Sequence, residues 1–574
     1  MPADHGQKTG PFVILKENDQ GASTMQANKQ DWMRDLVIYQ VYPRSFMDSN
    51  GDGIGDLNGV RQKLPYLQEL GVNALWLSPF FCSPGDDNGY DISDYQNIQP
   101  EFGTMEDCEA LIQECHQRGM RIIFDLVVNH SSDEHPWFLE SSSSRDNDKS
   151  DYYIWRDPVD GHEPTNWASV FGGSAWEYVP ARGQYYFHLF SRKQPDLNWR
   201  CPDVKKAIFS MMAWWAKKGV DGFRVDAVSH YSKPETFVDS TLPPMPDGYR
   251  PAFDQICNKP ETHAIVHAMN SEIFTPYNLV TVGEVSCQGP QDLQAYALPE
   301  REEFDMVIPF IPPQMDVGLN PVELLRNRFE SQYEALKNGG WWALFLSNHD
   351  KPRQVSSLGN EGTYWEPSAK ALALFLHDLP GTPFVYEGEE LGMTNAYFSS
   401  IDDYRDLDSH NVYHSLLLSG KTPEEALHGV WQVSRDHART PMQWTSGDHA
   451  GFTTGTPWMR VNENAGHINV EQEQKDPLSV LHFYKKLIAL RHREPLLKEG
   501  TLAFIDTPYP KQLIAYRRQK GDRSLLFVAN LSDNACPIPF PLPEKEPLLT
   551  SWERELSPRP AGQLRPYEAM LWEE

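Results

Sequence analysis

The 574-residue chain lacks long hydrophobic runs and has a clear deficit of positive charge. No apolar stretch approaches the roughly 20 residues that a membrane-spanning helix needs. Lysine and arginine number 51 against 80 aspartates and glutamates, so the formal net charge of -29 repels phosphate backbones and anionic lipid. We therefore expect neither nucleic acid nor a membrane among the partners of this protein.

Cysteine is scarce too, with seven residues scattered singly between Cys82 and Cys536. Their odd number and their spacing differ from those of a disulfide framework or a zinc site, which predicts reduced thiols. Residues 1–30 contain no apolar core of a secretory signal, so we expect a cytoplasmic protein. A regular pattern begins only at Asp31 and Trp32, and residues 1–30 are predicted to be a disordered or tag-like leader.

Aromatic residues are abundant, with 17 Trp, 24 Tyr and 27 Phe. They offer flat apolar faces to an uncharged ring-shaped ligand, although a well-filled core alone also explains them. With 40% hydrophobic residues the chain can bury a large interior, and its length predicts one large domain with one or two smaller ones.

Eight short apolar runs, separated by helical patterns, are predicted to be strands. They lie near residues 37–41, 74–77, 122–128, 222–225, 280–283, 306–308, 343–345 and 384–386. This alternation is typical of repeated βα units. We therefore expect an α/β fold, a parallel (β/α)8 TIM barrel, over residues 31–130 and 201–495.

Residues 131–200 interrupt the alternation after the third strand. They are rich in turn residues and aromatics and predict a loop-rich inserted subdomain that overhangs the carboxyl ends of the barrel strands. A second irregular stretch, residues 387–458, is expected at the same mouth. Short alternating segments at 512–517 and 525–530 predict a C-terminal antiparallel β-sandwich domain over residues 496–574.

The predicted fourth strand carries a charged wall. A period of two places Gly222, Arg224 and Asp226 on one face, with apolar residues on the other. Asp226 would then lie at the opening of the barrel. For this stretch alone, a carboxylate that caps the next helix or pairs with an arginine is the alternative explanation.

Two further acidic residues, Glu284 and Asp350, also end predicted strands. On a barrel all three carboxylates converge at one mouth. A glycosidase needs one carboxylate to attack or to activate water, and one carboxylic acid to protonate the leaving oxygen. His130 and His349 end strands as well, and two histidines at one mouth favour ligand binding over a purely structural role. A catalytic metal is disfavoured because no short-spaced histidine pair is present.

Four ordered segments carry a family resemblance. Asp125–His130, Gly222–Asp226, Val282–Glu284 and Ser347–Asp350 resemble the signature segments of the α-amylase family. More narrowly, Val41–Phe46, Asp86–Asp91, Lys193–Trp199 and Ala438–Trp444 resemble its oligo-1,6-glucosidase and α-glucosidase branch. The match runs from about residue 31 to the end of the chain.

The resemblance implies a retaining glycoside hydrolase. Asp226 would be the nucleophile and Glu284 the acid and then the base, while Asp350 would hold the sugar hydroxyls. Arg224 lies beside Asp226 in the predicted strand and is expected to keep that carboxylate ionised.

The resemblance also assigns substrate-binding residues. His130 and His349 would hydrogen-bond the sugar in the first subsite, with Tyr90 as its stacking platform. Asp87 and Arg435 would close the blind end of the pocket around the terminal glucose, which favours cleavage from the chain end.

Oxygen-bearing side chains alternate with glycines between Asp48 and Asp56. Such a loop can build a calcium cage, although Gly59 stands where an EF-hand has its bidentate glutamate. The resemblance places a structural divalent ion, predicted to be Ca2+, in this loop. The predicted ligands are Asp48, Asn50, Asp52, Asp56 and the carbonyl of Ile54. An Asx turn without an ion is the alternative.

Departures from the branch pattern fall where the linkage is chosen. Ala227 follows the nucleophile where oligo-1,6-glucosidases commonly carry valine, and a smaller residue is more like the α-1,4-acting relatives. Lys351 and Ser357 stand where relatives tend to carry glutamine and often arginine. The segment Val285–Cys287 after the acid is also unusual.

We expect an exo-acting α-glucosidase, a monomer without an organic cofactor, that hydrolyses short α-glucosides such as maltose or isomaltose. The alternatives of the same fold are a sucrose isomerase, a sucrose hydrolase or a transglucosidase. The charged cluster typical of sucrose isomerases after Asp350 is absent. A non-catalytic amylase-like binding subunit is the alternative from another class, and such relatives carry a membrane span and usually lose the triad.

Overall fold

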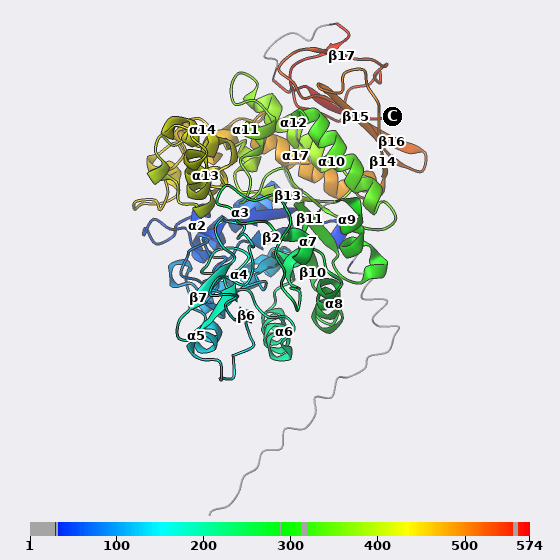
Figure 1. Ribbon diagram of the computed structural model, residues 1–574. Helices are drawn as coiled ribbons and strands as arrows, with labels where there is room; N and C mark the ends of the chain where they lie inside the picture. Colours follow the sequence, from blue (N-terminus) through cyan, green and yellow to red (C-terminus); the bar gives the residue numbers. More distant parts are fainter. Residues whose placement is uncertain (1–28, 30–31, 288, 311–317, 555–560) are drawn as a thin grey trace, which may run out of the picture.

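The computed structural model describes Lys29 and residues 32–287, 289–310, 318–554 and 561–574 (Figure 1). The predicted leader, residues 1–30, therefore lies outside the described residues except for Lys29. The ammonium group of Lys29 forms an ion pair with Asp305 at 2.7 Å. This contact fixes the side chain of Lys29 against the amino-terminal end of a barrel strand.

Eight parallel strands form the central barrel. Their bounds are β1 (Ile38–Val41), β2 (Ala74–Leu77), β5 (Arg121–Leu126), β9 (Gly222–Val225), β10 (Val280–Ser286), β11 (Met306–Phe310), β12 (Ala343–Leu344) and β13 (Thr382–Tyr386). Each strand pairs with its neighbour in chain order, and β13 pairs back onto β1. An isolated parallel bridge between Val307 and Trp342 joins β11 to β12. The predicted TIM barrel and its eight strands are confirmed.

Successive residues of the barrel strands face two different hydrophobic clusters. On β2, Ala74 and Trp76 belong to the cluster inside the barrel, whereas Leu75 and Leu77 pack in the layer between strands and helices. On β9 the interior positions are Gly222 and Arg224 instead. A Cβ at Gly222 would lie 2.3 Å from the carbonyl oxygen of Val280 in the next strand, so only glycine fits. With Gly222 and Arg224 at its interior positions, β9 therefore presents no apolar side chain to the inside of the barrel.

Helices surround the barrel (Figure 1). Helices between or after the barrel strands include α3 (Leu57–Leu70), α4 (Met105–Gln117), α6 (Pro202–Lys217), α8 (Pro260–Met269), α10 (Pro321–Leu336), α12 (Trp365–Asp378) and α17 (Val480–Arg493). Local signals set their ends: Asp56 caps α3 by accepting a hydrogen bond from the Gly59 amide, and Thr104 and Asp107 form a capping box on α4.

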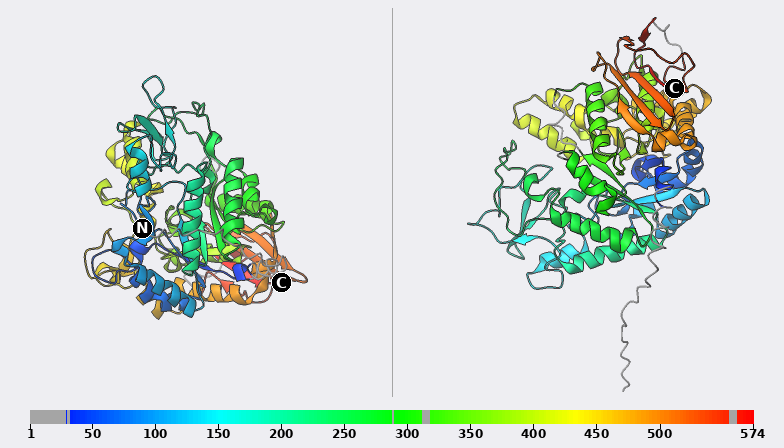
Figure 2. Two further views of the ribbon diagram at one scale, coloured as in Figure 1. Left: turned by 90° about the horizontal axis from the view of Figure 1, so that it is seen from below. Right: turned by 90° about the vertical axis from the view of Figure 1, so that its right-hand side faces the viewer.

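The insertion after the third barrel strand has a small fold of its own. It contains α5 (Pro136–Ser143) and a three-stranded antiparallel sheet in the order β6 (Trp155–Arg156), β8 (Gln184–Phe187) and β7 (Trp176–Val179). Figures 1 and 2 show the insertion and the C-terminal domain on different sides of the barrel.

The second irregular stretch contains two helices that the sequence analysis does not predict. These are α13 (Leu407–Leu418), capped by Asp406, and α14 (Pro423–Val433), which begins with a capping box. They contact each other, and Figure 1 shows them near each other at one edge of the molecule. The periodicity of α13 is hidden because almost none of its side chains is fully buried.

The C-terminal domain is a two-layer antiparallel structure, as predicted. A five-stranded sheet runs in the order β14 (Thr501–Phe504), β15 (Leu513–Lys520), β16 (Arg523–Asn530), β20 (Ala569–Glu573) and β18 (Leu549–Thr550), and a second sheet pairs β17 (Cys536–Pro537) with β19 (Gln563–Leu564). Along β15, Ile514 and Tyr516 pack toward the barrel core, whereas Leu513 and Ala515 share a cluster with the second sheet. The sheet thus buries both faces.

Two further observations concern the whole described chain. No helix within it combines the length and the apolar character needed to cross a membrane. All seven cysteines have free thiols, and burial raises the pKa of Cys108 and of Cys115 to about 12. Burial therefore keeps these two thiols protonated and unreactive.

Candidate active site

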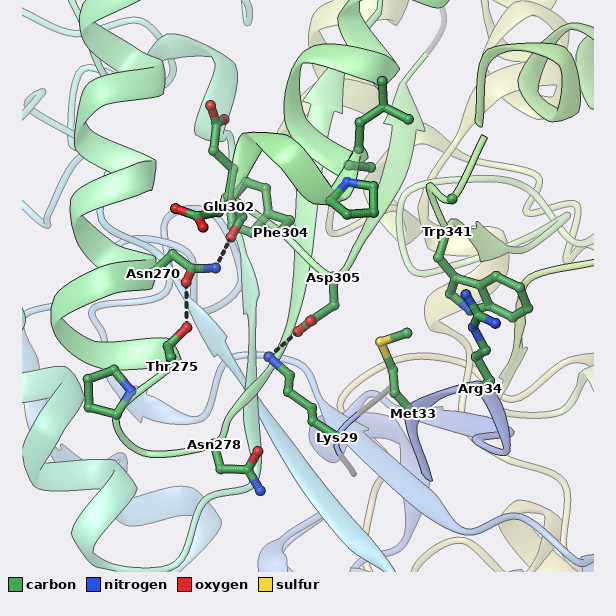
Figure 3. A pocket seen from close by; sticks show the side chains of 16 residues that line it. Lys29, Met33, Arg34, Asn270, Thr275, Asn278, Glu302, Phe304, Asp305 and Trp341 are labelled. Carbon is green, nitrogen blue, oxygen red and sulfur yellow. Dashed lines mark hydrogen bonds and ion pairs between the residues drawn. The ribbon is translucent and has the colours of Figure 1, made fainter. Parts of the chain in front are cut away.

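The structure contains two large cavities at opposite ends of the barrel. One, of ≈ 490 Å³, lies at the amino ends of the strands, where Lys29 pairs with Asp305 and the Arg34 guanidinium lies over the Trp341 ring (Figure 3). None of the predicted site residues lines it. The other, of ≈ 460 Å³, lies at the carboxyl ends, where the active sites of such barrels are built.

The cavity at the carboxyl ends brings most of the predicted site together. Of the predicted residues, it is lined by Asp87, Tyr90, His130, Asp226, Glu284, Asp350 and Arg435. Arg224 and His349 do not line it, because both side chains are fully buried behind its wall. They reach the cavity only through the carboxylates that they contact.

Asp226 directly follows β9 and is oriented by the strand that precedes it. Its Oδ1 accepts a hydrogen bond from Arg224 Nη1 at 2.6 Å, and the same nitrogen donates to Asp125 Oδ1 at 2.7 Å. The Asp226 amide donates to the carbonyl of Leu126 in β5. The carboxyl group is thus fixed at the edge of the cavity by two neighbouring strands.

The protonation of Asp226 differs from the expectation that Arg224 keeps it ionised. Burial raises the pKa of Asp226 to about 7, with Asp125 and Asp350 adding to the rise, while Arg224 opposes it. The arginine lies where the sequence predicts. The charge of Arg224 is shared with other carboxylates, however. The desolvation of the buried Asp226 carboxyl group therefore has the larger effect on this pKa.

Glu284 lies within β10, opposite Ile308 of β11. Its carboxylate forms an ion pair with Nη2 of Arg224, on the other side of the guanidinium from Asp226. One guanidinium therefore holds both predicted catalytic carboxyl groups, together with Asp125. Because the guanidinium is planar and compact, it keeps Asp226 and Glu284 close to each other.

Asp350 is surrounded by positive charge. Its Oδ1 lies 3.1 Å from Arg439 Nη2 and 3.3 Å from Arg435 Nη1, and its Oδ2 lies 3.1 Å from His349 Nε2. Burial alone would raise the pKa of Asp350. The Nε2–H of His349 and the positive charges of Arg435 and Arg439 hold this pKa well below its usual range, so the carboxyl group is ionised.

His349 links Asp350 to the aromatic wall. Its Nδ1 accepts a hydrogen bond from Gln40 Nε2 at 2.8 Å, which leaves the proton on Nε2, and Nε2 lies 2.5 Å from the hydroxyl of Tyr90. The Tyr90 and His349 rings stack with 5.4 Å between centroids and 8° between planes. Burial lowers the pKa of His349 to about 3, so the ring is neutral.

Charged side chains from several segments contact one another in the wall of the cavity. Asp87 Oδ1 lies 3.2 Å from Arg435 Nη2, and Asp87 Oδ2 accepts a hydrogen bond from Gln194 Nε2. Arg435 also donates from Nε to Asp406 at 3.0 Å. The same Gln194 amide lies 3.1 Å from Nε2 of His130. These contacts join the loop after β2, the insertion and the segment after α14.

The insertion is attached to the barrel by a buried lysine. The Lys233 ammonium forms an ion pair with Asp196, donates to Asn129 Oδ1 at 2.9 Å and donates to the carbonyl of His230. Asp196 in turn accepts a hydrogen bond from the amide of Leu189. The lysine therefore connects the loop after β9 with the segment that carries Gln194.

Ala227, next to Asp226, adopts a left-handed backbone conformation with φ 44° and ψ 33°. Few residues other than glycine and asparagine tolerate this region. Its side chain lines the cavity beside Asp226. The residue that differs from the branch pattern is thus part of the cavity wall.

The predicted calcium loop is held by bonds to its own backbone. Asp48 accepts from the amides of Gly51 and Gly53 at 2.7 and 2.8 Å, and Asp56 accepts from the Gly59 amide at 2.7 Å. In the described part of the chain, no three His, Cys, Asp or Glu residues are grouped closely enough to hold a metal. The donor set of the loop consists of oxygens alone, which is the set that Ca2+ prefers.

Residues 40–500 match the family described as the alpha-amylase catalytic domain. The chain belongs to the α-amylase family. Residues 506–571, within the C-terminal domain, match a family described as a domain of unknown function. Together with the order of its strands around the barrel, this membership makes the chain a glycoside hydrolase.

Close relatives of this α-amylase family chain have several specificities. The chain is 45% identical over 566 residues to the oligo-1,6-glucosidase of Parageobacillus thermoglucosidasius, covering 94% of this chain and 98% of the relative. The crystal structure of Bacillus licheniformis trehalose-6-phosphate hydrolase superposes with a TM-score of 0.86 at 40% identity, covering 94% and 99% of the two chains. An isomaltulose synthase of Erwinia rhapontici superposes with a TM-score of 0.86 at 38% identity, with the same coverage.

The sequence analysis missed part of the cavity wall. The missed lining residues are Val170, Phe171, Phe190, Ala227, His230, Phe253, Ser286, Phe310, Lys351 and Asp408. Several of them belong to the insertion or to the α13 segment, which have no strand periodicity to place them. Ala227, Ser286 and Lys351 lie at departures from the branch pattern that the sequence analysis identifies, one or two positions after a predicted catalytic residue, but the sequence analysis does not place them in the cavity wall.

Proposed function

We propose that the chain is an exo-acting retaining α-glucosidase that releases terminal α-linked glucose from short α-glucosides. The observation that carries this proposal is the arrangement of Asp226, Glu284 and Asp350 around one cavity that the Asp87–Arg435 ion pair also lines, and in this proposal that pair closes the far end of the cavity. A closed end leaves room for the terminal sugar unit but not for the interior of a long chain.

The spacing of the carboxyl groups supports retention of configuration. Asp226 and Glu284 contact adjacent nitrogens of one guanidinium. Contact with one guanidinium keeps the two carboxyl groups near each other, which suits the about 5–5.5 Å spacing of a retaining enzyme better than the about 6.5–9.5 Å spacing of an inverting one.

In this proposal Asp226 attacks the anomeric carbon while Glu284 gives its proton to the glycosidic oxygen, and the aglycone leaves. Glu284 then takes a proton from water, whose oxygen displaces Asp226 and frees glucose. Asp350, held ionised by His349 and the arginines, accepts hydrogen bonds from the sugar hydroxyls as the ring distorts. His130 and Tyr90 line the same end and complete the glucose subsite.

The relatives support this activity and also define its rival. Several curated relatives at 43–45% identity are named oligo-1,6-glucosidases. The similarity to an isomaltulose synthase keeps a sucrose-converting enzyme as the second candidate. The two differ in whether the glucosyl group is passed to water or to a sugar.

We also propose that the loop from Asp48 to Asp56 binds a structural Ca2+ and that the protein is a cytoplasmic monomer. Asp48, Asn50, Asp52, Asp56 and the Ile54 carbonyl would hold the ion, which would cross-link the loop by oxygen ligation. The free thiols of all seven cysteines support a reducing compartment.

Product analysis on a substrate panel tests the activity. We expect glucose from maltose, isomaltose or p-nitrophenyl α-glucoside, with the α-anomer appearing first in an NMR time course. Asp226→Asn should lower kcat/KM by a factor of about 10³ or more. Asp522→Asn, at an exposed turn of the C-terminal domain, is the matched control and should keep full activity. Undiminished activity of Asp226→Asn would exclude this nucleophile, and reaction with sucrose alone would favour the rival.

A further inference from the structure

A third cavity, of ≈ 380 Å³, lies between the insertion and the barrel. We call it the seam cavity and define it by Trp155 and Arg156 of β6, Trp199 and Arg200 at the end of the insertion, and Tyr231 and Phe237 after β9. Its volume lies in the range of small-molecule sites, about 300–1,000 Å³. It is separate from the active-site cavity, which none of these six residues lines.

Two guanidinium groups face the seam cavity. Arg156 donates to the carbonyls of Trp155 at 2.7 Å and Glu235 at 3.0 Å, and it has no carboxylate partner among the described residues. Arg200 pairs with the carboxylate of Glu235 at 3.2 Å, but that side chain is 81% exposed and weakly bound in water. The positive charge of Arg200 adds to burial in lowering the pKa of Arg156, which shows that the two cations repel each other.

Aromatic rings form part of the remaining wall of the seam cavity, which is also lined by Asp151, Arg182, Lys233, Glu235 and Glu261. The rings of Trp199 and Tyr231 stack with 5.3 Å between centroids and 13° between planes. Phe237 lies beneath Arg156, with 4.6 Å between the guanidinium carbon and the ring centroid. The organic part of a ligand could pack on these rings while its negatively charged group contacted the guanidinium groups.

We propose that the seam cavity binds a small phosphate monoester, with the oxyanion between Arg156 and Arg200 and the organic body against the aromatic wall. Arginine is suited to this task because its planar fork donates two parallel hydrogen bonds to one phosphate. An oxyanion between the two guanidinium groups would also remove their mutual repulsion.

A ligand in the seam cavity would contact both the insertion and the barrel. On the barrel side, the Tyr231 hydroxyl donates to the backbone carbonyl of Asp226 at 3.0 Å, and Trp199 Nε1 donates to the carbonyl of Val128 at 2.9 Å. Occupancy should therefore stabilise the folded protein across this interface and change the fluorescence of Trp155 and Trp199.

Calorimetric titration of the full chain with glucose 6-phosphate, inorganic phosphate and glucose tests the proposal. We expect saturable binding of glucose 6-phosphate that weakens at least tenfold in the double variant R156Q/R200Q, together with loss of the fluorescence change and of the rise in Tm. Neither arginine belongs to the catalytic machinery, so the double variant should keep the glucosidase activity of the wild type. R145Q, an exposed arginine of the insertion that pairs with Asp157, is the matched control and should bind normally.

Three outcomes would overturn the proposal. Equal binding by the wild type and R156Q/R200Q would exclude the arginines, and competition by maltose would place the phosphate ester in the active site. Binding of inorganic phosphate as tight as that of glucose 6-phosphate would indicate an adventitious ion only. Loss of catalysis in Asp226→Asn with intact binding of glucose 6-phosphate is expected, because the two sites are separate.

Discussion

The ammonium group of Lys233 and the carboxylate of Asp196 form an ion pair that is buried between the barrel and the insertion. Lys233 belongs to the loop after the strand of the nucleophile, whereas Asp196 is next but one to Gln194, which contacts His130 and Asp87. One buried cation therefore links the loop after β9 to the part of the insertion that contacts His130 and Asp87.

Replacing this lysine should destabilise the protein strongly. In Lys233→Met the carboxylate of Asp196 stays buried without its partner, which typically costs about 3–5 kcal/mol of unfolding free energy. Urea unfolding measures the change. Lys193→Met, whose 3.8 Å contact with Glu134 is exposed, is the control and should change stability by less than about 0.5 kcal/mol. Similar losses in both variants would contradict the role of Lys233.

The fall of kcat/KM at low pH, which is the acid limb of the pH profile, should follow the protonation of Asp226. Burial raises the pKa of Asp226 to about 7. As the pH falls below that value, the carboxylate that acts as the nucleophile becomes protonated, and kcat/KM should fall with it. Asp125→Asn removes a negative charge that raises this pKa and frees Arg224 for Asp226. The limb should therefore move to lower pH, by about one unit. A pH profile of kcat/KM measures the shift, and an unmoved or raised limb would show that another group controls it.

The residue after the nucleophile should control the preferred linkage. In Ala227→Val two added methyl groups narrow the cavity beside Asp226. An α-1,6 linkage has an extra rotatable bond and adapts better than an α-1,4 linkage. We expect the ratio of kcat/KM for maltose over isomaltose to fall about tenfold. The left-handed backbone at this position should also cost valine about 1–2 kcal/mol of stability. A constant ratio would remove Ala227 as the determinant.

Removal of calcium should lower stability without touching catalytic groups. If Ca2+ binds the loop from Asp48 to Asp56 at about 100 times its Kd, chelation should remove about 2.7 kcal/mol of unfolding free energy, and added Ca2+ should restore it. Asp52→Asn, which weakens a predicted exposed ligand, should make the Tm less sensitive to the chelator. A wild-type Tm that is indifferent to exhaustive chelation would leave the Asx-turn explanation.

The barrel could be predicted from the sequence because each of its strands is encoded by a short, continuous stretch of residues. Each strand is a short apolar run. In the stretch Gly222–Asp226, the glycine and the charged residues occupy alternate positions, which predicts a polar wall on one face of the strand. The carboxyl ends of parallel strands meet by geometry, so the convergence of Asp226, Glu284 and Asp350 on one mouth follows from the βα topology alone.

The rest of the site depends on contacts that no local pattern encodes. The Asp87–Arg435 pair joins residues 348 positions apart, and Asp406 reaches the same arginine from the helical pair that the sequence analysis missed. The protonation of Asp226 could not be predicted either, because it depends on how one guanidinium is divided among Asp125, Asp226 and Glu284.

The Asp87–Arg435 closure has a kinetic consequence. In the proposed exo-acting enzyme the cavity has a single opening, so the aglycone must leave before the released glucose can follow, and both must leave before another chain end arrives. The enzyme cannot slide along a polymer between cleavages. Degradation should therefore be distributive, with intermediate chain lengths accumulating in solution and free glucose competing with substrate for the innermost position.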